Sequence, residues 1–164
     1  FINGLQAIVL SMFAILIYVW FRFEWQFGIG AVIALIHDVL FTLGILSIFN
    51  IDFNLSTIAA ILTISGYSIN DTVVIYDRIR ENLRKYKKTD ILDLFNISLN
   101  NTFSRTLITS VTTLIALLSL YILGGEVIRS FSFTMIVGVL IGTYSSIYIA
   151  VPALLLFKFR KSEE

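Results

Sequence analysis

Five long apolar stretches constrain the fold of this chain more than any other feature. They cover residues 5–21, 25–49, 55–76, 102–123 and 128–157. Each is close to the roughly 20 residues that a helix needs to cross a bilayer. None shows the sustained alternation of a barrel strand, and backbone polar groups inside a bilayer must be satisfied within the segment. We therefore expect an all-α integral membrane protein, a bundle of five transmembrane helices.

The composition supports a membrane protein and excludes several other classes. Hydrophobic residues make up 57% of the 164 residues and charged residues 14%, whereas soluble domains carry about 45–50% and about 25%. A disordered chain would show the opposite bias. Cysteine is absent, so a disulfide scaffold is excluded, and a net charge of +1 does not indicate nucleic-acid binding. We find no Cys/His ligand cluster and no phosphate loop, and expect neither a metal nor an organic cofactor.

Basic residues predict the orientation. If the spans alternate in direction, ten of the twelve Lys and Arg residues fall on one side: Arg22, Arg78, Arg80, Arg84, Lys85, Lys87, Lys88, Lys158, Arg160 and Lys161. The other side carries Arg129, and Arg105 lies inside the fourth span. The positive-inside rule places the ten in the cytoplasm. We expect the first residue outside and the C-terminus inside. Because the chain starts with Phe1, we also expect an earlier span and external segment to be missing.

Residues 77–101 form the longest polar segment of the sequence, and we expect this segment in the cytoplasm. Its first residues, 77–82, can continue the third span as a helix, and Thr89 is a candidate cap for a second, surface helix. The segment is interpreted either as a solvated loop that touches anionic lipid or as a docking site for a cytoplasmic protein. Trp20 and Trp25 fit an aromatic belt at this side of the membrane.

Four ionisable residues fall inside the predicted spans: His37, Asp38, Asp71 and Arg105. Each costs about 2.5–3.5 kcal/mol on insertion scales, which makes it a functional candidate. Counted from the outer ends of their spans, Asp71 lies about 24 Å deep and Arg105 about 27 Å deep. They can pair, either as a buried ion pair that locks two helices or as a proton-responsive switch. Arginine stays charged, so the Asp71 carboxylate would titrate, with Asn70 as a hydrogen-bonding neighbour.

Small and polar residues continue these positions along helical faces. The two stripes are Ala59, Thr63, Gly66 and Asn70 on the third span, and Arg105, Thr109, Thr113 and Ala116 on the fourth. Such faces pack against helices or line water. Gly138 and Gly142 form a GxxxG packing motif in the last span, which they and Pro152 are expected to bend or end. His37 and Asp38 are interpreted as a packing pair or a proton relay.

Residues 66–82, GYSINDTVVIYDRIREN, resemble the SecF family, whose members are membrane subunits of the bacterial SecDF protein-export complex. Residues 35–39, 104–106, 124–127 and 142–146 carry the same resemblance, which extends over essentially the whole chain. The family belongs to the resistance-nodulation-division superfamily of proton-driven membrane proteins. Its members have six spans with a large external domain between the first two. The resemblance therefore implies that residues 1–164 are a SecF transmembrane domain without its first span and external domain.

The resemblance also implies a function. SecF pairs with SecD, which has a similar bundle, and works beside the SecYEG channel in the bacterial cytoplasmic (inner) membrane. The pair uses the protonmotive force to promote the export of preproteins, and it is not an enzyme. The residues that match Asp71 and Arg105 are implicated in proton transfer in the family. The partner carboxylate on SecD lies outside this chain, so a complete proton path is not expected from this chain alone.

Three other interpretations are compatible with parts of the sequence. Half of a proton-driven lipid or drug exporter of the same superfamily would use Asp71 in the same way. A structural scaffold subunit would need Asp71 for stability and not for coupling. An intramembrane aspartyl protease would need Asp38 and Asp71 almost in contact, whereas their depths differ by about 8 Å. The motif over residues 66–82 favours the SecF family over these three alternatives.

Overall fold

The computed structural model describes residues 2–157, and the elements in that range are helical. They are α1 (Ile2–Arg22), α2 (Trp25–Ile48), α3 (Leu55–Lys85), α4 (Ile91–Leu123), α5 (Glu126–Ser145), the π-helical turn η1 (Ser146–Ala150) and α6 (Val151–Leu154). No strand occurs between residues 2 and 157, so the predicted all-α class is confirmed. Three of the basic residues that predict the orientation, Lys158, Arg160 and Lys161, lie outside the described residues.

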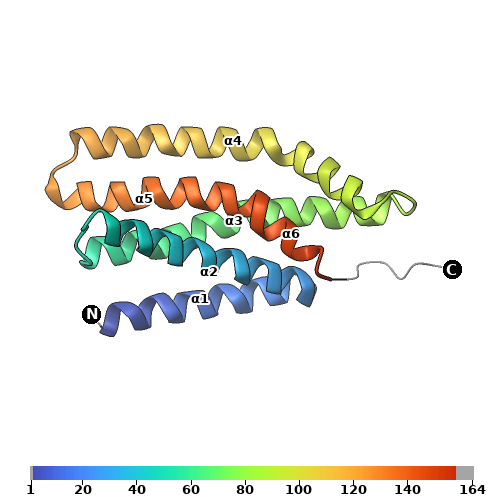
Figure 1. The fold of residues 1–164 in the computed structure, drawn as a ribbon, viewed down its shortest axis with the longest axis horizontal. Helices are drawn as coiled ribbons and strands as arrows, with labels where there is room; N and C mark the ends of the chain where they lie inside the picture. The colour runs from blue at the N-terminus through green and yellow to red at the C-terminus, as the bar shows by residue number, and fades with distance from the viewer. Residues whose placement is uncertain (1, 158–164) are drawn as a thin grey trace.

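The five long helices lie side by side along one axis, with α1 and α4 at opposite edges of the view in Figure 1. Four apolar stretches are long enough to cross a membrane: α2, α3, α4 and Ile128–Leu154. The described apolar part of α1, Gln6–Arg22, is shorter. The whole of α1 nevertheless has 21 residues. It is therefore about 31 Å long, similar to the roughly 30 Å of the hydrocarbon core. The predicted bundle of five helices is present.

The polar segment between the third and fourth spans differs from the prediction. It contains no separate surface helix, because α3 and α4 both continue through it and enclose only residues 86–90. Neither Gly nor Pro occurs in α4, so nothing in the sequence interrupts that helix. The N-cap is Asp90 and not Thr89, and the Asp90 carboxylate accepts a hydrogen bond from the Leu92 N–H at 3.1 Å.

The hairpin of α3 and α4 has its own packed interior beyond the predicted spans. Leu94 and Phe95 of α4 are buried in the same cluster as Ile79 of α3. Burying a Leu or Phe side chain contributes about 1.5–3 kcal/mol. The Asn82 side-chain amide donates to the Ser98 hydroxyl at 2.8 Å, and both residues are buried. These contacts explain why the two helices stay paired past the membrane.

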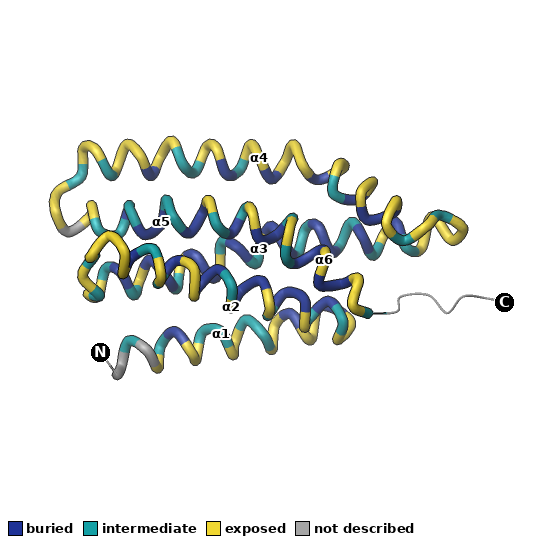
Figure 2. The backbone as a smooth tube through the Cα atoms, viewed as in Figure 1, coloured by how far each residue is buried: buried dark blue, intermediate teal, exposed yellow. Residues whose placement is uncertain are grey.

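Helix α5 lies against α3 through small residues. A Cβ added at Gly142 would lie 3.0 Å from the Ser68 Cβ, and a Cβ added at Gly138 would overlap the Ile64 side chain. Glycine therefore allows the two helices to approach closely at these two positions. Figure 2 shows the result as a buried strip along α3 and α5, whereas α4 is exposed along its outer side.

The last span is broken at the position where proline predicts a bend. The α-helix gives way to the π-helical turn η1, and Pro152 follows at the start of α6. Proline has no N–H, so the regular ladder of hydrogen bonds cannot continue through it. The Tyr76 hydroxyl, fully buried on α3, donates to the Ala150 carbonyl at 2.8 Å. The break is thereby tied to the helix that carries Asp71.

Candidate functional site

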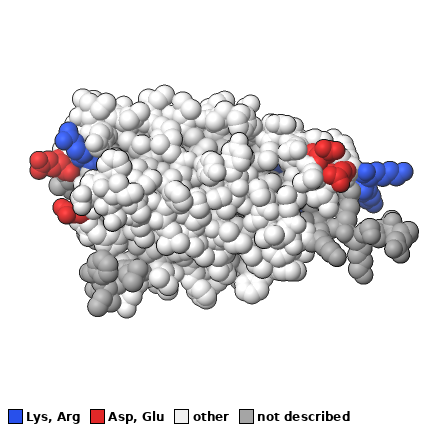
Figure 3. All heavy atoms as spheres, viewed as in Figure 1, with Lys and Arg blue, Asp and Glu red and all other residues white. Residues whose placement is uncertain are grey.

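Charged side chains are scarce in the middle of the bundle. On the face drawn in Figure 3 they gather at the two ends of the molecule. The sequence predicted four ionisable residues inside the spans. His37 and Asp38 lie on α2, Asp71 lies on α3 and Arg105 lies on α4. Their surroundings therefore define the candidate site.

Asp71 lies on the buried side of α3, with 4% of its surface exposed. Its Oδ2 atom is buried and has no hydrogen-bond partner. Native proteins pair the great majority of their buried polar atoms, so an unpartnered carboxylate oxygen in a membrane helix makes Asp71 a candidate functional group.

Arg105 lies on α4 and is exposed. It lines a hollow of about 330 Å³ between α3 and α4, together with Asp77, Arg78 and Asn101. No salt bridge joins Arg105 to Asp71 in the described structure, so the direct buried ion pair is not formed. The same hollow borders Val74, which lies three residues after Asp71 on α3. Arg105 therefore faces the stretch of α3 next to Asp71 without being paired with it.

Asn70 does not support the carboxylate in this arrangement. It is exposed on the outer side of α3, and no hydrogen bond joins these two neighbouring residues in the part of the chain that the structure describes. Consecutive residues on a helix point about 100° apart, which explains why Asp71 is buried while Asn70 is not.

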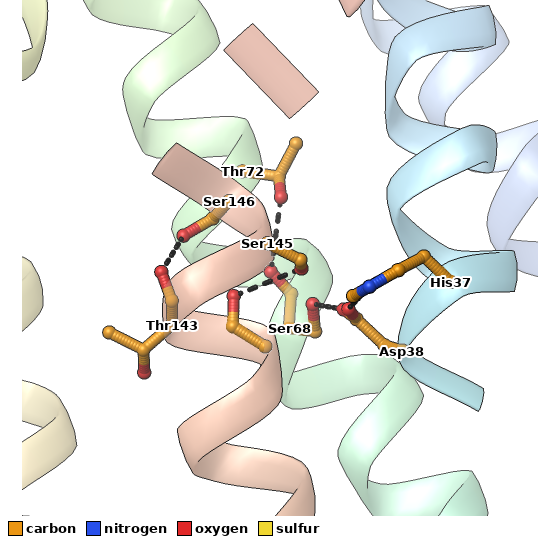
Figure 4. A network of polar contacts seen from close by, with 8 residues as sticks. His37, Asp38, Ser68, Thr72, Thr143, Ser145 and Ser146 are labelled. Carbon is orange, nitrogen blue, oxygen red and sulfur yellow. Dashed lines mark hydrogen bonds and ion pairs between the residues drawn. The ribbon is translucent and has the colours of Figure 1, made fainter. Parts of the chain in front are cut away.

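His37 and Asp38 form a second polar site, drawn in Figure 4. Asp38 is fully buried, and its Oδ1 atom lies 3.1 Å from the His37 Nδ1 atom. Its other oxygen, Oδ2, accepts a hydrogen bond from the Ser68 hydroxyl of α3. The Thr72 hydroxyl in turn donates to the Ser68 carbonyl at 3.3 Å. A continuous set of polar groups therefore reaches from α2 to the turn of α3 that carries Asp71.

Ser68 was not among the site residues predicted from the sequence. It precedes Asp71 by three residues and Thr72 by four, which places all three on one helical face, and this spacing could have identified it. The contact also bears on the predicted offset of about 8 Å between Asp38 and Asp71, because Ser68 lies toward the outer end of α3 from Asp71, as that prediction requires. Ser68 touches Asp38 and lies only about 4.5 Å along the helix axis from Asp71. Depth counted from helix ends ignores how neighbouring helices are shifted.

Other hydroxyl groups line the same layer of the bundle. Ser110 of α4 and Thr143 of α5 are hydrogen-bonded at 2.7 Å, which joins these two helices. The Ser145 and Ser146 hydroxyls donate to the Gly142 and Thr143 carbonyls of α5, near the Asp38 site in Figure 4. Thr106 follows Arg105, and its hydroxyl is buried without a partner. No group of three or more His, Cys, Asp or Glu that could hold a metal occurs among the described residues.

The fold and the site define a polytopic helical membrane protein with two buried carboxylates, Asp38 on α2 and Asp71 on α3, and an arginine on α4 that forms no salt bridge with a described residue. A family model described as "Protein export membrane protein SecD/SecF, C-terminal" matches residues 1–160. The chain therefore belongs to the SecD/SecF family of protein export membrane proteins. The resemblance noted in the sequence is confirmed.

Individual relatives agree with this assignment. The chain is 58% identical over 161 residues to "Protein translocase subunit SecF" of Rickettsia bellii (strain OSU 85-389), which covers 98% of this chain and 53% of that protein. It is also 58% identical over 158 residues to the protein of the same name from Rickettsia rickettsii (strain Sheila Smith), covering 96% of this chain and 51% of that protein. The chain thus spans about half the length of these curated relatives.

Solved structures show the same fold. The crystal structure of SecDF from Thermus thermophilus, described as a translocon-associated membrane protein, matches with a TM-score of 0.91 and 45% identity. The match covers 96% of this chain and 22% of that one. A second SecDF crystal structure, in a super-membrane-facing form, matches with a TM-score of 0.83 and 46% identity over 88% of this chain and 20% of that one. The bundle is therefore a recurring unit within larger proteins.

Proposed function

We propose that this chain is the membrane portion of an auxiliary subunit of the Sec protein translocase. In this role it uses the protonmotive force to promote the export of preproteins, and it catalyses no reaction. Family membership and relatives named protein translocase subunit SecF support the translocase role. The observation that carries the proton role is the buried Asp71, with one oxygen unpartnered, one helical turn from a hollow that the unpaired Arg105 lines.

The proposed mechanism is a change in attraction between α3 and α4. When Asp71 is charged, it draws Arg105 toward α3, and when it holds a proton, Arg105 is free to face the hollow beside it. The membrane potential supplies about 2.3 kcal/mol per charge per 100 mV, which is enough to bias two packings of a helix pair. The proposal needs no metal or organic cofactor, because the driving force acts on a carboxyl group of the chain itself.

The proposed partner in the membrane is SecD. The residues of the stripe on α3 are exposed, and so are Arg105 and Ala116 on α4. A polar and small-residue face is poorly suited to lipid but well suited to another helix. The similar structures are SecDF proteins in which this bundle is about a fifth of the chain. We propose that this face meets SecD, and that SecYEG and preproteins are the further partners.

The proposed location is the bacterial cytoplasmic membrane, with the first residue outside and the C-terminus in the cytoplasm. The protein is a multi-pass membrane protein by its helices and its relatives. The excess of basic residues at the α1–α2 turn and the α3–α4 hairpin supports this orientation. The hollow beside Arg105 would then open toward the cytoplasm.

The test is protonmotive-force-dependent release of a preprotein from membrane vesicles after ATP is exhausted. Vesicles would carry the full-length protein and SecD, either wild type, Asp71→Asn, or the control Asp93→Asn on the exposed first turn of α4. We expect Asp71→Asn to remove the effect of the force and Asp93→Asn to keep it, at equal assembly with SecD. Force-dependent release at the wild-type rate in Asp71→Asn would favour a scaffold role and contradict the proposal.

A further inference from the structure

A second feature lies at the end of the bundle where α1 stops and α3 leaves the predicted span. An open hollow of about 580 Å³ is lined there by four basic and two acidic side chains. We call it the basic pocket, and its lining residues are Arg22, Asp77, Arg80, Glu81, Arg84 and Lys85. It adjoins the hollow that Arg105 lines, with which it shares Asp77 and Glu81, but the proton role does not use its arginines.

Salt bridges within the described residues occupy both acidic groups of the pocket. Asp77 pairs with Arg22 at 2.9 Å, and Glu81 pairs with Arg78 at 2.6 Å. The Arg80, Arg84 and Lys85 side chains form no ion pair with any described residue. The pocket therefore keeps a positive charge that no described residue balances.

Arg80 is the clearest example of an unpaired basic group in the pocket. Its Nε atom is buried and has no hydrogen-bond partner. Arg84 follows one helical turn later, so the two guanidinium groups lie on the same face of α3. Guanidinium groups bind phosphate with paired, charge-assisted hydrogen bonds. Two adjacent unpaired arginines thus fit an anionic phosphate better than a single positive surface charge would.

The depth of the pocket points to the source of that phosphate. The salt bridge of Arg22 and Asp77 joins the end of α1 to α3, and the exposed Trp20 and Trp25 lie beside it in sequence, as in an interfacial belt. From that level Arg80 lies about 4–5 Å further along α3 and Arg84 about 10 Å. The headgroup layer on each side of a bilayer is about 5–8 Å thick. Arg80 falls within it, and the longer reach of Arg84 allows its guanidinium to return to it.

We propose that the basic pocket binds the phosphate of an anionic phospholipid headgroup, with Arg80 and Arg84 as its ligands. Arg22, held by Asp77, forms the wall of the site next to the hydrocarbon core. A free phosphate ion carries the same chemical group as the lipid headgroup and is the alternative ligand. Basic pockets beside transmembrane helices are known to hold anionic headgroups in this way.

The test is native mass spectrometry of the full-length protein with SecD in detergent, titrated with phosphatidylglycerol or with phosphatidylcholine. The variant is Arg80→Gln with Arg84→Gln, and the control is Lys87→Gln with Lys88→Gln, which removes the same charge from the exposed turn next to it. We expect about a tenfold loss of phosphatidylglycerol affinity in the first variant, little change in the control and no change for phosphatidylcholine.

Further arms keep the result decisive. Arg80→Lys with Arg84→Lys keeps the charge but loses the paired hydrogen bonds, so we expect an intermediate affinity even if the Gln variant fails to assemble. An equal loss in the Lys87 and Lys88 control would show a general surface charge and overturn the proposal. So would binding of inorganic phosphate that excludes phosphatidylglycerol, or lipid binding that is unchanged while contact with a translocon protein is lost.

Discussion

Helices α3 and α4 make an informative comparison, because both cross the bundle and both extend past it into the same hairpin. In the most apolar window of α3, 44% of residues are buried inside the bundle, against 17% for α4. Helix α3 has neighbours on several sides and carries the buried Asp71. Helix α4 is covered along one side and shows Arg105 on the open part. One helix holds the titratable group in the core, and the other presents its countercharge at an edge.

The difference teaches where each kind of residue acts. A charge at the edge of a membrane bundle is costly in lipid, by about 2.5–3.5 kcal/mol on insertion scales. The exposed Arg105 therefore requires a protein neighbour or a water-filled hollow outside α4. Apart from Asp71 itself, we expect substitutions on the buried side of α3 to change stability, and we expect substitution of Arg105 on the open side of α4 to change coupling.

The largest expected effect on stability follows from Gly138→Val, where the new side chain would overlap Ile64 on the buried side of α3. Overpacking of this kind costs about 3 kcal/mol. The control is Gly66→Val on the exposed side of α3, where nothing lies within 4 Å of an added Cβ. Unfolding in mixed detergent micelles measures both. Equal losses for the two variants would break the distinction between the two sides of α3.

A somewhat smaller loss is expected for Ser68→Ala. In the wild type, the Asp38 Oδ2 atom accepts a hydrogen bond from the Ser68 hydroxyl in a fully buried site. The variant removes this donor. An unsatisfied buried acceptor costs about 1–3 kcal/mol. Ser119→Ala is the matched control, because the Ser119 hydroxyl bonds only to its own helix and is exposed on α4. The same unfolding measurement should leave Ser119→Ala near wild type, and a wild-type value for Ser68→Ala would show that this bond does not stabilise the bundle.

Tyr76→Phe should lower the free energy of unfolding by about 0.5–1.5 kcal/mol. It removes the hydrogen bond to the Ala150 carbonyl while keeping the buried ring. Tyr148→Phe removes a hydroxyl from a residue that is 63% exposed and serves as the control. Hydrogen exchange of the η1 amides is a second readout, and we expect it to quicken in Tyr76→Phe alone. Unchanged exchange would contradict the link between α3 and the break in the last span.

The smallest change in stability is expected for Arg105→Gln, within about 0.5 kcal/mol, because exposed substitutions seldom exceed that range. Its effect on force-dependent release should nevertheless be as complete as that of Asp71→Asn. Measuring unfolding and release on the same preparation separates the two effects. A large loss of stability with normal release would reverse the roles assigned to the two helices.

Much of the fold followed from the sequence. Apolar runs of sufficient length located all five helices, and the proline at position 152 marked the break in the last one. The segment after the third span was harder, because residues 77–101 are polar and carry no clear stop signal. Burial of Leu94 and Phe95 against α3 is what makes α4 begin so early, and a pattern along one chain segment does not show a contact with another.

The candidate site was predicted in part. Its ionisable residues stood out because charges are rare in spans, and no structure was needed to find them. Whether Asp71 and Arg105 pair depends on side-chain direction, which residue counting does not give. The role of Ser68 depends on how far α2 is shifted along α3, and that shift is set by packing, including the close approach at Gly142.

The most direct test of the proton role is infrared difference spectroscopy of the full-length protein with SecD in liposomes during an imposed pH step. The carboxyl band that disappears in Asp71→Asn identifies this residue. We predict that the band changes intensity over the pH range in which preprotein release responds to the force, and that Arg105→Gln shifts that range. A band that stays constant over the same range would show that Asp71 does not exchange a proton during coupling, and would contradict the proposed function.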